Sequence, residues 1–204
     1  KRDWSSDVCS SDLKNLEAEV ARMLKDPKSR ALVENFADQW LQIRNLANIS
    51  PDRATFPNWD DELRVAMRKE TELFFENLMR EDRNLLELLD ANYSFMNERL
   101  ARHYGVDGVK GSEFQKVIFK DKQRGGILTH GSVLTITSNP TRTSPVKRGK
   151  WILENILGSP PPPPPPNVPE LSESKEAALS GSLRQRMEQD RKSTRLNSSH
   201  VSES

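Results

Sequence analysis

The chain has 204 residues, with 31 lysines and arginines against 30 aspartates and glutamates, a net charge of +1 and 6% aromatic residues. This balance argues against a dedicated nucleic-acid-binding protein, which would carry a basic surface interleaved with aromatic side chains. No apolar run reaches the roughly 18 residues of a membrane-spanning helix, so we expect no membrane span within the fragment.

Both ends differ from the rest of the chain. Residues 1–13 and 192–204 are rich in serine, lack apolar periodicity and resemble translated sequencing-adapter DNA. We interpret both as artefacts rather than disordered tails and exclude them from fold reasoning. The single cysteine, Cys9, lies in the first of them, so cysteine usage says nothing about the redox compartment.

The pattern over 14–47 predicts two helices. One side of 14–25 carries Leu16, Val20, Met23 and Leu24. Asp26 and Pro27 fit the cap and first residue of the next helix, over 27–47. Its apolar positions recur at helical spacing: Leu32, Val33, Phe36, Trp40, Ile43 and Leu46. We predict that Trp40 is a core anchor.

The clearest helix follows a loop over 48–59. Asn58 can cap it, and three acidic residues in the first turn favour the helix dipole. Its predicted core face consists of Leu63, Met67, Phe74 and Leu78. The carboxylates Glu70, Glu72 and Glu76 stand among basic residues, so we interpret them as a solvated charged face rather than catalytic acids. A short helix over 83–89 follows, with Asp82 as its cap and its leucines predicted in the core.

Residues 93–104 predict another helix, ended by Gly105. The segment 114–119 partly alternates and fits a short strand or an extended crossing segment. Residues 127–137 fit a strand or a helix packed closely at Gly131, and we favour the helix. We interpret His130 as a buried, satisfied histidine, because a haem or metal ligand needs a partner that the sequence does not show.

The stretch 137–171 combines a basic loop, a short apolar helix and seven consecutive prolines. Ser144 and Pro145 fit the start of the helix, and Gly158 fits its end. Pro160–Pro166 predicts a polyproline II spacer. Cations near the helix start oppose its dipole, which leaves two interpretations: a solvated loop, or a site for an anion or an acidic partner. The candidate contact residues are Arg142, Lys147, Arg148 and Lys150.

No catalytic constellation is visible. The sequence lacks a glycine-rich phosphate loop, G-x-S-x-G, H-E-x-x-H and C-x-x-C. We therefore predict no catalytic residues, no metal site and no cofactor within the fragment, and favour a role other than catalysis.

Several long stretches carry a family resemblance: 36–46 (FADQWLQIRNL), 60–82, 98–106 (ERLARHYGV), 124–140 (RGGILTHGSVLTITSNP) and 141–166. They resemble a family known from planctomycetes and related environmental bacteria. Its members are large secreted proteins with consecutive domains of unknown function, commonly beside cytochrome c-type segments. The resemblance implies a periplasmic or secreted location and a C-x-x-C-H haem-attachment motif downstream of 182–191, in a segment missing from this sequence.

We therefore predict a mainly α protein. A helical domain of unknown function over 14–104 precedes a smaller helical or mixed domain over 105–158. A polyproline rod and flexible linker follow over 159–181, and then the start of a truncated helix over 182–191. The expected role is to scaffold or dock the downstream haem segment. The alternative is a module that binds or degrades polysaccharide, in which Trp59, Trp151 and the basic loop grip an acidic glycan.

Overall fold

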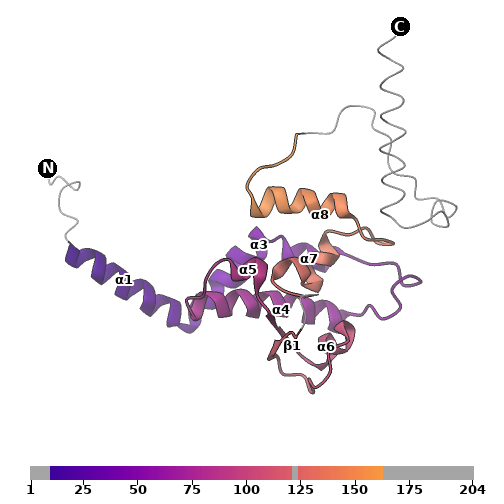
Figure 1. Cartoon of the computed structure of the whole chain (residues 1–204), viewed down its shortest axis with the longest axis horizontal. Helices are drawn as coiled ribbons and strands as arrows, with labels where there is room; N and C mark the ends of the chain where they lie inside the picture. Colours follow the sequence, from indigo (N-terminus) through magenta and orange to yellow (C-terminus); the bar gives the residue numbers. More distant parts are fainter. Residues whose placement is uncertain (1–9, 121–123, 163–204) are drawn as a thin grey trace, which may run out of the picture. The chain divides into compact units, whose positions relative to one another are not determined.

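The computed structural model describes residues 10–120 and 124–162, and the chain is mainly helical, as predicted (Figure 1). It divides into two compact units, Lys1–Pro161 and Pro162–Ser204. The predicted proline rod beyond Pro162, the linker and the helix over 182–191 lie outside the described residues, as do 1–9 and 192–204.

The first part of the chain is helical, with interruptions at Asp26 and Gln42. Helix α1 (Ser10–Lys25) leads through a 3-10 turn (Pro27–Ser29) to α2 (Arg30–Leu32), a π-helical turn (Val33–Ala37) and α3 (Asp38–Trp40). Asp26 caps the turn by accepting the Lys28 backbone N–H, as predicted. Gln42, with φ of 58°, breaks the predicted continuous helix before a 3-10 helix (Ile43–Asn48).

Helix α4 (Asp61–Arg80) carries the predicted apolar face, and Leu63, Met67, Phe74 and Leu78 are buried. Its cap is Asp60, whose carboxylate accepts the Leu63 backbone N–H at 2.6 Å. The prediction that Asn58 would cap it was wrong, because Asp60 lies one residue before the first helical position.

The predicted helix over 83–89 is also corrected. Only α5 (Glu87–Asp90) forms, and Asp82 has a positive φ of 46° instead of capping a helix. Leu88 is buried, whereas the other predicted core leucines are exposed: Leu85, Leu86 and Leu89. Residues 83–86 precede the helix and α5 has only four residues, so the leucines share no continuous helical face that could be buried.

The predicted helix over 93–104 was wrong in its first half. Strand β1 (Tyr93–Met96) pairs antiparallel with β2 (Gln115–Ile118), with Tyr93 opposite Ile118. Asn97 then caps α6 (Glu98–Tyr104), which Gly105 ends with a positive φ of 69°. The backbone hydrogen bonds of β1 are made by β2, a strand some twenty residues later in the sequence. The local pattern over 93–104 does not reveal this partner strand.

The later elements follow the predictions closely. A 3-10 turn (Ile127–Thr129) precedes α7 (Gly131–Ile136), so the helical interpretation of 127–137 is confirmed. Ser144 accepts the Lys147 backbone N–H and Pro145 begins α8 (Pro145–Trp151). A π-helical turn (Ile152–Ile156) continues it, and Gly158 has the expected positive φ of 58°.

Two apolar clusters form the core, and both lie around α4. The first contains Leu41, Phe74, Tyr93, Ile127 and Trp151, and the second is built around Leu63, Met67, Met96 and Leu100. The first cluster combines side chains from before and after residue 105, the predicted start of the second domain. The domain boundaries predicted at 14–104 and 105–158 remain predictions.

The apolar side predicted for α1 is exposed: Leu16, Val20 and Met23 all lie at the surface. Among the described residues, no helix is both long enough and apolar enough to cross a membrane.

Candidate functional site

The four predicted contact residues lie in α8 and in the loop before it. The Arg148 guanidinium donates to the hydroxyls of Thr137 and Thr143, at 3.3 and 3.1 Å. Lys150 pairs with Glu154 one turn later, at 3.6 Å. Lys147 is exposed, and Arg142 closes a turn through backbone bonds with Asn139. Their role as an anion or partner contact stays a prediction.

The interior of the unit holds a cluster of polar side chains that we call the buried polar cluster: Glu70, Thr71, Ser94, Tyr104, His130 and Ser132. Helix α4 supplies the first two, β1 and α6 the next two, and the start of α7 the last two. Glu70 is 1% exposed, His130 2% and Ser132 0%. The interpretation of Glu70 and Glu72 as a solvated face was therefore wrong.

Hydrogen bonds hold the Glu70 carboxylate from two sides. Tyr104 donates its hydroxyl to Oε2 at 2.6 Å, and Ser94 donates to Oε1 at 2.7 Å. The backbone N–H of Gly131 donates to the Tyr104 oxygen at 2.6 Å, so the carboxylate is tied to the start of α7. The Arg124 guanidinium lies over the Tyr104 ring, 3.7 Å from its centroid.

His130 completes the cluster, and its interpretation as a buried, satisfied histidine is confirmed. Its Nδ1 lies 3.0 Å from the Thr71 hydroxyl, which is 2.7 Å from the Ser132 hydroxyl. The imidazole packs edge-on against Phe74 at a centroid distance of 4.9 Å. Ser94 Oγ is 3.5 Å from Nε2, too long for a firm hydrogen bond.

Burial sets the ionisation of this cluster. It raises the pKa of Glu70 to about 7, against the opposing effect of the Tyr104 and Ser94 hydrogen bonds. Burial, helped by the positive charge of Arg124, lowers the pKa of His130 to about 3. The imidazole is therefore neutral at pH 7, and the carboxyl is near its midpoint.

A periodic signal could have located Glu70. Residues 63, 67, 70, 74 and 78 are spaced by four, three, four and four positions, which places Glu70 on the buried stripe of α4. Its basic neighbours point elsewhere. Arg68 and Lys69 instead pair with Glu72, whose side chain is also largely buried.

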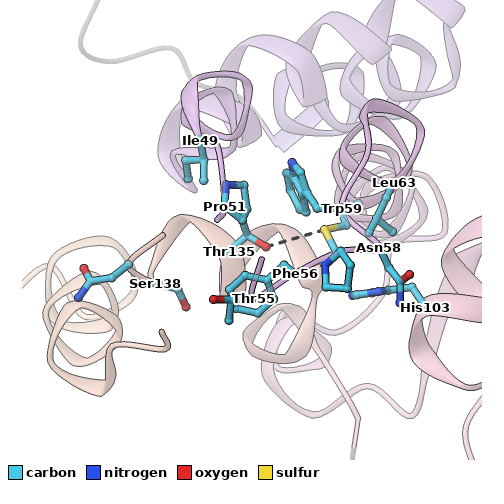
Figure 2. Close-up of a pocket in the computed structure, with 13 residues that line it drawn as sticks. Ile49, Pro51, Thr55, Phe56, Asn58, Trp59, Leu63, His103, Thr135 and Ser138 are labelled. Atoms are coloured by element: carbon cyan, nitrogen blue, oxygen red, sulfur yellow. Dashed lines mark hydrogen bonds between the residues drawn. The ribbon is translucent and has the colours of Figure 1, made fainter. Parts of the chain in front are cut away.

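A pocket of about 300 Å³ opens between the loop before α4 and the end of α7. Figure 2 shows Pro51, Phe56 and Trp59 among the residues that line it, together with Thr135 and Ser138. The Thr135 hydroxyl donates to the Met67 sulfur at 3.8 Å across its floor. We call this the Trp59 pocket. Sequence reasoning missed it, because its walls come from segments some 80 residues apart.

The two tryptophans predicted to grip a glycan have different environments. Trp59 lines the Trp59 pocket, whereas Trp151 is 4% exposed and belongs to the core. Within the described ranges, no group of three or more histidine, cysteine, aspartate or glutamate side chains could hold a metal ion.

Two family models match the chain in succession. Residues 10–106 match "PSD4: Protein of unknown function (DUF1592)", and residues 124–202 match "PSCyt3: Protein of unknown function (DUF1588)". No curated protein and no solved structure matches the chain. Both the buried polar cluster and the Trp59 pocket draw residues from the two matched segments. The chain therefore belongs to the planctomycete-type, cytochrome c-associated proteins in which a DUF1592 domain precedes a DUF1588 domain.

Proposed function

We propose that this chain is a non-catalytic platform that holds a haem-bearing segment of the same protein. The name of the second matched family, PSCyt3, associates it with a cytochrome. The haem segment of this proposal lies downstream of the sequence, and its iron is held by residues outside this chain. Export to the periplasm or the cell exterior belongs to the same proposal, because the family resemblance of the sequence implies it.

The observation that carries the proposal is the attachment of the segment that leads into the prolines. The Trp40 indole donates to the Asn155 carbonyl at 2.6 Å, and the Gln42 amide donates to the Asn155 side chain at 3.2 Å. Trp151 is buried in the first core cluster. These contacts hold the last helical turns before Pro160 against the rest of the unit. A platform that positions a following segment requires such an attachment.

The buried polar cluster supports a structural role rather than turnover. A catalytic acid or base must reach the proton that it transfers. Glu70 and His130 are instead enclosed, and their polar atoms face side chains of the cluster. The cluster joins α4, β1, α6 and α7, so it stabilises their arrangement. A polysaccharide role gains no support, because Trp151 is buried.

The test begins with the parent gene. We expect its reading frame to continue past Arg191 into C-x-x-C-H and to begin with an export signal. The encoded protein should then bind covalent haem, measured by haem staining and the pyridine haemochrome spectrum. A frame with neither motif contradicts the proposal.

A second measurement tests the platform itself. Hydrogen–deuterium exchange is compared between the parent protein and a version ending before the haem motif. We expect slower exchange in surface peptides of 10–162 when the haem segment is present. Identical exchange throughout 10–162 would show that the body does not hold that segment.

A further inference from the structure

The Trp59 pocket continues into a second, polar hollow. Both are lined by Pro57, Asn58 and His103, and the second adds Asp60, Arg99 and Arg102. One compartment is therefore apolar and the other carries two guanidinium groups. We propose that the two together bind a small carboxylate with a flat apolar ring, a ligand that neither matched family description mentions.

The apolar compartment suits a ring. Trp59 and Phe56 supply aromatic faces and Pro51 supplies further apolar surface (Figure 2). Met67 also lines this compartment. Aromatic side chains favour stacked or edge-on contacts with another ring. A volume of about 300 Å³ lies at the lower end of the range for small-molecule sites, so one or two fused rings fit better than a chain of sugars.

The two arginines have different roles in the polar compartment. Arg99 is fixed, because it donates to the Asp60 carboxylate and to the Asn58 carbonyl, at 2.6 and 2.7 Å. Arg102 is 72% exposed at its side chain and pairs with Glu98, one helical turn earlier, at 3.0 Å. An exposed pair of this kind contributes little stability, so Arg102 can exchange Glu98 for a ligand.

Charge determines which ligand is favoured. The Asp60 charge is compensated by Arg99 and by the Leu63 backbone N–H, so the cation that meets the ligand is Arg102, whose exposed pairing with Glu98 can be exchanged. An arginine binds a carboxylate through two parallel hydrogen bonds, with both strength and orientation. The carboxylate therefore lies at Arg102 and the ring at Trp59.

The test uses the complete chain and two matched probes, 2-naphthoate and its neutral amide, in calorimetric titrations. We expect saturable binding of 2-naphthoate with 1:1 stoichiometry, and at least tenfold weaker binding of the amide. Absence of saturable binding, or equal affinity for both probes, overturns the proposal.

Two variants locate the site. Arg102→Gln should weaken 2-naphthoate at least tenfold and leave the amide unchanged. Arg83→Gln is the matched control, because Arg83 also pairs with a glutamate one turn away but lies outside the pocket lining. Trp59→Leu should weaken both probes, with thermal unfolding used to verify that it folds. Unchanged 2-naphthoate affinity in Arg102→Gln overturns the proposal, whatever Trp59→Leu does.

Discussion

A buried carboxyl beside a buried imidazole gives the pH dependence of stability an unusual form. Glu70 has its pKa raised by burial from 4.5 to about 7, so the folded state holds its proton more tightly than the unfolded chain. That contribution to stability is present at low pH and is lost as pH rises from about 4.5 through 7. His130 acts in reverse, and its contribution is lost as pH falls from 6.5 through about 3.

We predict that Glu70→Gln changes this profile. The substitution removes the ionisation and keeps the side-chain shape, so the variant should gain stability relative to the parent as pH rises from about 4.5 to 7. The relative gain should approach roughly 3 kcal/mol, because each pKa unit corresponds to about 1.4 kcal/mol. Thermal and urea unfolding at intervals of half a pH unit would measure it.

The control for this measurement is Glu113→Gln, at an exposed position. Its free energy of unfolding, measured at the same pH values, reports the effect of removing an exposed carboxyl. If the stability of Glu70→Gln relative to the parent followed the same pH course as that of this control, burial would not raise the pKa of Glu70 in the folded protein.

At this scale, sequence reasoning identified two caps from local residues, although the caps predicted at Asn58 and Asp82 were wrong. The Asp26 and Ser144 caps follow from residues within three positions of the N–H groups that they accept. The burial of Glu70 depends instead on Ser94, Tyr104 and Gly131, which come from three other elements. The charged residues next to Glu70 in the sequence suggested an exposed position, although its spacing from the apolar residues of α4 indicated a buried one.

At the scale of elements, α7 packs closely against α4 and α6. A methyl group placed on Gly131 would lie 2.8 Å from both the Met67 terminal carbon and the Tyr104 oxygen. The methionine end can move, but the Tyr104 hydroxyl is held by Glu70 and by the Gly131 N–H. The absence of a side chain at Gly131 therefore permits both the close approach of α7 to α4 and α6 and the hydrogen bond from the Gly131 N–H to the Tyr104 oxygen. The spacing of apolar residues over 127–137 predicted a helix packed closely at this glycine.

We predict that Gly131→Ala destabilises the protein by about 1–3 kcal/mol, as overpacking of a filled interior does. The matched control is Gly149→Ala in α8, where a methyl group meets nothing within 4 Å. That change should stabilise by up to about 1 kcal/mol through helix propensity. Urea unfolding of both variants would test the pair, and equal effects would contradict the close packing of α7.

The elements also show where periodicity fails. Helix α4 was predicted well, because twenty residues of one pattern decide it. Residues 93–96 were assigned to the wrong element, because β1 depends on hydrogen bonds with 115–118 rather than on its own pattern. Short segments between strong helices take the structure that their tertiary neighbours permit.

At the scale of the whole unit, two family segments share one interior. The first core cluster combines Leu41, Phe74 and Tyr93 from residues 10–106 with Ile127, Val133 and Trp151 from 124–202. Neither segment alone covers these side chains, and the Glu70 hydrogen-bond network also crosses between them. Sequence patterns could predict helices in each segment, but the shared core depends on contacts across more than a hundred residues.

We predict that residues 10–106, expressed alone, do not unfold cooperatively. Their helices should persist in far-ultraviolet circular dichroism, while the near-ultraviolet signal of the tryptophans and the heat-capacity peak are lost. Residues 10–162 should retain both. A sharp transition in the shorter fragment, at the temperature of the longer one, would show that the first segment folds independently.

The Trp40–Asn155 hydrogen bond also has a consequence for synthesis on the ribosome. Its partners lie 115 positions apart, so at roughly 5–20 residues per second about 6–23 s pass between the translation of one and of the other. Throughout that interval, the Trp40 indole lacks this hydrogen-bond partner, while the Phe36 and Phe75 rings that it contacts in the folded protein are translated before the partner. The nascent chain therefore presents the Trp40 indole to chaperones until the segment around Asn155 has been made and packs against it.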